Sequence, residues 1–114
     1  MQDTQAASEH AVQPHPLDGL RAEIDEVDEQ ILRLARRRLQ ICETVALVKR
    51  DHEIPMMQNN RIAVVRARFT DLARELGLSP DFALRLYEVQ LEEACRVEDE
   101  ILVPGGPVPG EVSR

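Results

Sequence analysis

The sequence predicts an all-α protein with one long helix and two shorter ones. Three observations support this fold class. Apolar residues recur at alternating spacings of three and four, which is the period of an amphipathic helix. The seven prolines and five glycines of the 114-residue chain cluster near its ends and in two short breaks. No segment shows the apolar–polar alternation of a β-strand.

The first predicted helix runs from about Leu17 to Asp51. At ~1.5 Å per residue it is roughly 50 Å long. Two shorter helices cannot cover an amphipathic helix of this length, so we expect a second copy of the chain to pack along it. One face of this helix carries a row of nine aliphatic residues, called the seam below, with the permanent cation Arg38 between the sixth and the seventh. The nine are Leu17, Leu20, Ile24, Val27, Ile31, Leu34, Ile41, Val45 and Val48.

The second predicted helix follows a break at Pro55, which disfavours helix at the preceding residue. We expect Asn59 or Asn60 to be its N-cap and the helix to run to about Leu76. Gly77 is well placed to end it. Its apolar stripe is Ile62, Val65, Phe69, Leu72 and Leu76.

The third predicted helix begins at "SPD". Ser79 provides a cap, Pro80 suits the first turn and Asp81 complements the helix dipole. The helix is expected to end near Val103. Its stripe places an acid in an apolar line: Leu84, Tyr87, Leu91, Ala94, Glu98 and Ile101.

The polar, proline-containing ends should be disordered, over residues 1–16 and 104–114, leaving one helical domain at 17–103. The net charge of −7 argues against a nucleic-acid partner, which needs clustered Lys and Arg. No apolar run reaches membrane-spanning length and no signal-peptide core is present, so we expect a soluble, cytoplasmic protein without a membrane partner. We interpret Cys42 and Cys95 as buried free thiols.

Motifs for metal, nucleotide-cofactor or covalent chemistry are absent, and we expect no cofactor. The three histidines have no metal-ligand spacing, and Ser79 is better explained as a cap than as a nucleophile. The unusual chemistry therefore lies in charged residues on apolar faces.

Four cations are candidate anion-binding groups. Arg38 and Lys49 share one helix face, with roughly 16 Å between their Cα atoms. Arg21 is too far along the same helix to join them, but an antiparallel second chain would bring it there. Arg61 lies beside a helix N-terminus, itself a favourable anion site. The competing interpretation is a solvated basic face, with Arg21 paired to Asp25 at i, i+4.

The strings "LRAEIDEVDEQILRLARRRLQICETVALVK", "IPMMQNNR" and "GLSPDFALRLYEVQLEEACRVEDEI" resemble the all-helical chorismate mutase family over about residues 17–102. The resemblance implies an intertwined three-helix homodimer with two equivalent sites. Each site would take Arg38, Lys49 and Arg61 from one chain and Arg21 from the other.

The resemblance also implies the chemistry. The substrate of the family is a small dicarboxylate that undergoes a [3,3]-sigmatropic rearrangement, which needs no acid, base or nucleophile. The site must hold the substrate in a compact reactive shape and stabilise charge on the breaking ether oxygen. Arg38 and Arg21 would hold carboxylates, Lys49 would donate to the ether oxygen, and Arg61 would support the charge network.

Three positions depart from the family pattern: Gln58 replaces a usual Asp, Ile62 a usual Glu, and Glu98 a usual Gln. The first two lie near the ring C4 substituent in the family, which suggests a different substituent there. "IPMMQ" and "CRVEDEI" also resemble the 4-amino-4-deoxychorismate mutases of p-aminophenylalanine-derived antibiotic biosynthesis. Glu98 would face the ether oxygen and must be protonated to donate. Burial favours the neutral acid and Lys49 the ionised form, and the sequence does not decide between them.

We therefore expect an isomerase that converts 4-amino-4-deoxychorismate to 4-amino-4-deoxyprephenate. The alternatives are a chorismate mutase, which converts chorismate to prephenate, an isochorismate-pyruvate lyase, and a non-catalytic regulatory helical dimer. Retention of all four cations weighs against the last.

Overall fold

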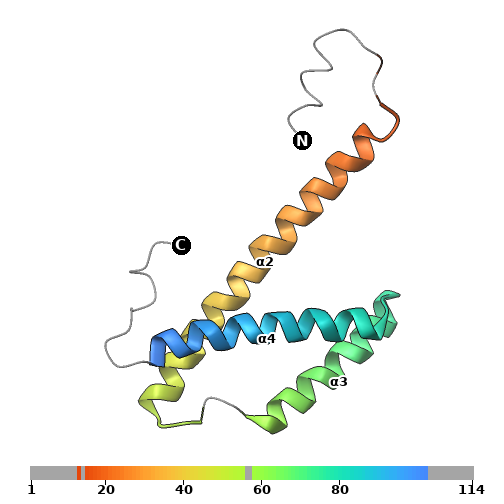
Figure 1. Cartoon of the computed structure of the whole chain (residues 1–114). Coiled ribbons are helices and arrows are strands. Elements are labelled where there is room, and N and C mark those ends of the chain that lie inside the picture. Colours follow the sequence, from red (N-terminus) through yellow and green to blue (C-terminus); the bar gives the residue numbers. More distant parts are fainter. Residues whose placement is uncertain (1–12, 14, 56–57, 103–114) are drawn as a thin grey trace. The chain divides into compact units, whose positions relative to one another are not determined.

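A computed structural model describes residues 13, 15–55 and 58–102, and its regular secondary structure within them is helical (Figure 1). Helix α2 spans Asp18–Asp51, α3 spans Asn59–Leu76 and α4 spans Pro80–Leu102. The predicted all-α class and all three predicted helices are confirmed. Residues 1–12, 14 and 104–114, where disorder was predicted, lie outside the described residues, and so does Val103, the predicted end of the third helix. None of the described helices combines the length and apolarity needed to cross a membrane.

Helix α3 begins differently from the prediction. Gln58, in extended conformation, is its N-cap, and both Asn59 and Asn60 are already helical. The prediction of an Asn cap was therefore wrong. The backbone carbonyl of Gln58 accepts from the Ile62 N–H at 3.1 Å, which makes Gln58 the first residue of the hydrogen-bond ladder. Its side chain makes no capping hydrogen bond.

The connection between α3 and α4 is as predicted. Gly77 has a positive φ of 73°, a conformation that glycine adopts without steric cost. The Leu78 N–H donates to the Ala73 carbonyl at 2.8 Å and the Gly77 N–H to the Arg74 carbonyl at 3.4 Å, which is the Schellman pattern. Ser79 then caps α4, because its Oγ accepts from the Phe82 N–H at 3.3 Å.

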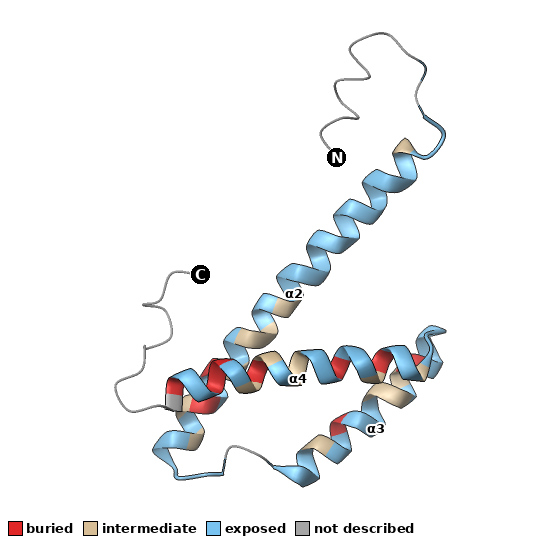
Figure 2. Ribbon diagram, viewed as in Figure 1, coloured by how far each residue is buried: buried red, intermediate tan, exposed pale blue. Residues whose placement is uncertain are grey.

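The chain divides into two units, residues 1–34 and 35–114. In the first, the described helix is the N-terminal half of α2. Every described side chain there is exposed except that of Asp18, which is half-buried (Figure 2). This unit therefore has no core of its own within the described residues, although it carries six of the nine aliphatic seam residues.

The second unit contains the C-terminal half of α2 together with α3 and α4. Its core is the cluster of Ala46, Val97 and Ile101, against which Leu39 and Leu47 pack. Helices α3 and α4 pack through the rings of Phe69 and Tyr87, whose centroids are 5.0 Å apart. The buried positions of α4 include most of the predicted stripe, so α4 turns that stripe inward and buries Glu98 with it: Tyr87, Ala94, Glu98 and Ile101.

Candidate active site

A cavity of about 480 Å³ in the second unit brings together five of the six predicted site residues. Its lining comes from α2, the start of α3 and α4. The chemically distinctive members are Arg38, Lys49, Gln58, Arg61 and Glu98. The sixth predicted residue, Arg21, is an exposed residue of the first unit and is not among those that line the cavity.

Helix periodicity explains how α2 contributes to the cavity. Arg38, Cys42, Val45 and Lys49 follow one another at intervals of four, three and four residues, so they share one face. Arg38 is half-buried, and its Nη1 lies 4.0 Å from Cys42 Sγ as a donor. The cation on the apolar seam thus faces the cavity.

Lys49 and Glu98 form an ion pair at the cavity wall. Lys49 Nζ lies 3.6 Å from Glu98 Oε1, and the two side chains are only 16% and 10% exposed. Burial raises the pKa of Glu98, although Lys49 opposes this by favouring the carboxylate. The structure therefore answers the question left by the sequence: burial outweighs the lysine, and the proton is held more tightly than in an ordinary glutamate.

Arg61 and Gln58 enter the cavity from the start of α3. Arg61 lies in the first turn, where the first backbone N–H groups have no intrahelical acceptor and the helix dipole is positive. No acidic residue occupies that first turn. The N-terminal end of α3 therefore adds to the positive character of this side of the cavity.

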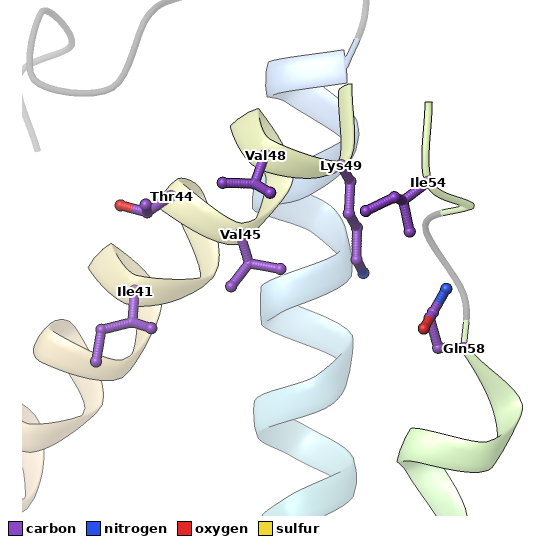
Figure 3. A pocket seen from close by; sticks show the side chains of 7 residues that line it. All are labelled: Ile41, Thr44, Val45, Val48, Lys49, Ile54 and Gln58. Carbon is purple, nitrogen blue, oxygen red and sulfur yellow. The ribbon is translucent and has the colours of Figure 1, made fainter. Parts of the chain in front are cut away.

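A second cavity of about 420 Å³ adjoins the first and shares Ile41, Val45, Lys49 and Gln58 with it. Its remaining walls are Thr44, Val48 and Ile54. Figure 3 shows the Lys49 side chain extending away from α2, with Ile54 and Gln58 on the side opposite to the valines. The second cavity is thus mainly apolar and is built on the exposed seam of α2.

Cys42 and Cys95 are free but half-buried, because both line the first cavity. The prediction of buried thiols was wrong in this respect. Burial still raises the pKa of both thiols. Each therefore stays a neutral thiol at physiological pH, and neither is an activated nucleophile.

The remaining lining residues were not singled out from the sequence as site residues, except for Ile62. Tyr87, Leu91 and Ala94 lie on the same α4 stripe as Glu98, so that stripe was the available signal. Within the described residues no group of three or more His, Cys, Asp or Glu side chains is arranged to hold a metal ion. What the cavity offers is three cations, one buried acid and an apolar wall, which suits binding of a small organic anion.

Comparison with known proteins gives a consistent result. Residues 20–99 match the family model of chorismate mutase type II. The chain is 45% identical over 98 residues to the 4-amino-4-deoxychorismate mutase of Streptomyces pristinaespiralis, a match that covers 85% of this chain and 76% of the relative. It is 40% identical over 86 residues to the enzyme of the same name from Streptomyces venezuelae, covering 75% and 84%.

A more distant relative is the chorismate mutase of Methanocaldococcus jannaschii, 24% identical over 83 residues that cover 73% of this chain and 84% of the relative. No solved structure gives a significant match. The family model spans most of the described helices, and its match includes the predicted site residues from Arg21 to Glu98. The chain belongs to the chorismate mutase type II family, and it is an enzyme of that type.

Proposed function

We propose that the protein converts 4-amino-4-deoxychorismate to 4-amino-4-deoxyprephenate by a [3,3]-sigmatropic rearrangement. The reaction takes place in a cytoplasmic homodimer with two equivalent sites. Each site uses Arg38, Lys49, Gln58, Arg61 and Glu98 of one chain and Arg21 of the partner subunit. No cofactor takes part.

The observation that carries this proposal is the convergence of Arg38, Lys49 and Arg61 on one cavity. A half-buried arginine on an apolar seam is costly unless an anion neutralises it. A dicarboxylate supplies two negative charges on a small body. Guanidinium groups bind carboxylates through two parallel hydrogen bonds, which fixes orientation as well as position.

The mechanism follows from what the rearrangement requires. The enolpyruvyl arm must fold over the ring, and two carboxylates held by separate cations keep it there. As the C–O bond breaks, negative charge grows on the ether oxygen. Lys49 donates a hydrogen bond to that oxygen, and Glu98 donates a second one in its protonated form.

The exposed seam of α2 supports the homodimer. Its nine aliphatic residues are between 40% and 64% exposed, from Val45 to Leu34, which is high for a continuous apolar row. An antiparallel second copy of α2 is matched to this row in length and spacing. The N-terminal half of the partner helix would cover the apolar second cavity and bring Arg21 of the partner subunit to the site.

The amino substrate is proposed because two relatives named as 4-amino-4-deoxychorismate mutases are 45% and 40% identical to this chain. Gln58 and Ile62, both on the cavity wall, carry no charge. A chorismate mutase is the second candidate, since the archaeal relative of that name matches at 24% identity.

A side-by-side kinetic measurement distinguishes the two candidate functions. Specificity constants for 4-amino-4-deoxychorismate and chorismate are measured side by side at one mildly alkaline pH. We expect the amino compound to be preferred by roughly tenfold or more, a difference of about 1.4 kcal/mol in transition-state binding. Equal or better turnover of chorismate would assign the protein to the second candidate.

A further inference from the structure

The first cavity has an unbalanced set of charges. Its cations are Arg38 and Lys49 from α2 and Arg61 from α3. Among the described residues that line it, Glu98 of α4 is the one carboxylic acid, and burial raises the pKa of that carboxyl. The balance is therefore strongly positive, and Arg21 of the partner subunit would make it more so.

The other titratable groups that face the cavity do not restore the balance. Burial raises the pKa of the Cys42 and Cys95 thiols, which keeps both neutral. Tyr87, on α4, contributes a buried ring at 3% exposure and no carboxylate. No lining group besides Glu98 offers a negative charge in the physiological range.

An amine entering this cavity can be charged or neutral. As an ammonium group it would be repelled by these three cations and by Arg21 of the partner subunit, whose charge the two carboxylates of the substrate offset only in part. It would also only donate hydrogen bonds where Arg and Lys side chains also only donate. As a neutral amine it keeps a lone pair that accepts from these donors. Proton loss is accessible, since amines beside electron-withdrawing groups, such as peptide α-amino groups, have pKa values of about 7.7–8.0.

The side chain of Gln58 can distinguish the neutral amine from the charged one. It lines both cavities, its side chain makes no capping hydrogen bond, and its amide both donates and accepts. A carboxylate at this position would instead offer an ammonium group its counter-charge. It would also be favourable for the helix, since it would stand at the positive end of the α3 dipole.

We propose that the enzyme binds its amino substrate with the nitrogen unprotonated, and that the neutral side chain of Gln58 is a specificity-determining feature for this charge state. This inference rests on the proposed function, since it requires the substrate to carry an amine. It adds the charge state in which the substrate is recognised.

The test uses the ratio of two specificity constants, for 4-amino-4-deoxychorismate and for chorismate, between about pH 6 and pH 9. Titrations of the free enzyme, including that of Glu98, act on both constants and cancel in the ratio. The pKa of the free substrate amine is measured separately by NMR titration. We expect the ratio to rise about tenfold per pH unit below that pKa and to level off above it.

Two results would overturn the inference: a ratio that is independent of pH, and a ratio that is level below the amine pKa and falls above it. The second is the signature of ammonium binding. Absence of turnover of the amino compound at every pH would overturn the proposed function itself, and the inference with it. Glu98→Gln gives an independent check, because its profile with the amino compound alone should keep the rising limb.

Gln58→Glu tests the residue, since it exchanges an amide for a carboxylate of the same shape. At pH values below the amine pKa, we expect the ratio of the two specificity constants, amino compound over chorismate, to be at least tenfold higher in this variant than in the wild type. The pH dependence of the ratio should then become level or reverse. Gln58→Met, neutral and of similar length, is the matched control and should keep the wild-type slope. A wild-type slope in Gln58→Glu would remove Gln58 from this role.

Discussion

The two halves of α2 carry the same aliphatic row but have different surroundings. In the C-terminal half, Leu39, Ala46 and Leu47 pack in the core of the second unit, while Arg38 and Lys49 line the cavity. In the N-terminal half, residues 19–34 are all exposed. Within the described residues, α2 thus gains packing partners in its C-terminal half only, on a face beside the aliphatic row, while the row itself stays exposed along both halves. In the proposed homodimer a second subunit covers the aliphatic row of the N-terminal half, so the two halves predict different consequences of mutation.

The largest effect is expected in the C-terminal half. Arg38→Ala should lower kcat/KM by about 10²–10³, since it removes a preorganised charged donor. The melting temperature should change little, because in the proposed function Arg38 binds the substrate rather than stabilising the fold. Steady-state kinetics and calorimetry measure the two effects. Arg37→Ala, at the exposed neighbouring arginine, is the control and should be nearly normal. Normal activity of Arg38→Ala, or its failure to fold, would contradict the assignment.

Arg21 tests whether the N-terminal half serves a site in the partner subunit. Arg21→Ala and Arg38→Ala should each be inactive alone. A 1:1 mixture after subunit exchange should recover about a quarter of wild-type activity, because half of the dimers would carry one intact site. Exchange is verified by mass spectrometry of tagged chains. No recovery in a mixture shown to contain heterodimers would argue against the shared site.

Two neighbouring residues test the dimer itself. Ile31, 53% exposed, lies on the seam, whereas Leu32, 71% exposed, lies off it. Ile31→Asp should weaken the dimer by several kcal/mol, since two copies of a buried aliphatic side chain, each worth about 1.5–3 kcal/mol, are lost per interface. Leu32→Asp is the matched control and should leave the dimer intact. Sedimentation measures both, and an active, folded wild-type monomer would refute the dimer proposal.

The smallest effect concerns Glu98 and pH. In the proposed mechanism only the neutral carboxyl of Glu98 donates to the ether oxygen, and burial raises the pKa of Glu98. Activity towards chorismate, which has no amine, should therefore be full below that pKa and fall up to tenfold per unit as the pH rises through it. The fall lies above the ordinary glutamate range near pH 4.3. Glu98→Gln should abolish this limb, and Glu98→Ala should be impaired at every pH.

The same pKa shift predicts a change in stability. The folded state holds the Glu98 proton more tightly than the unfolded chain does. The resulting stabilisation is complete below the unfolded pKa and is lost as the pH rises through the folded one. Urea titrations across this range should show the trend in the wild type and a weaker one in Glu98→Gln. Identical pH profiles for the two proteins, in activity and in stability, would remove Glu98 from both arguments.

Local signals in the sequence predicted most of the fold. Gly77 and Ser79 act through their own backbone and side chain, so the end of α3 and the start of α4 were predictable. The N-cap of α3 was not predictable, because Asn59 and Asn60 are favoured N-cap residues and no local sequence signal indicates Gln58. The helical period also placed Arg38, Lys49 and Glu98 on inward faces.

What the sequence did not provide depends on packing between helices. The direction of the Glu98 pKa shift requires the burial that α4 gains in the second unit, weighed against Lys49 at 3.6 Å. The half-burial of Cys42 and Cys95 requires the cavity, which a helical pattern alone does not reveal. The role of Arg21 depends on a second chain and remains a prediction.

The position of Tyr87 has a practical consequence for spectroscopy. The sequence contains no tryptophan and a single tyrosine, and that tyrosine is 3% exposed on the wall of the cavity. The near-ultraviolet circular dichroism and emission of the folded protein therefore come mainly from one ring, which lies on the cavity wall and in contact with Phe69. Ligand binding and local loosening of α3 against α4 are both observable in the unmodified protein, without an engineered label.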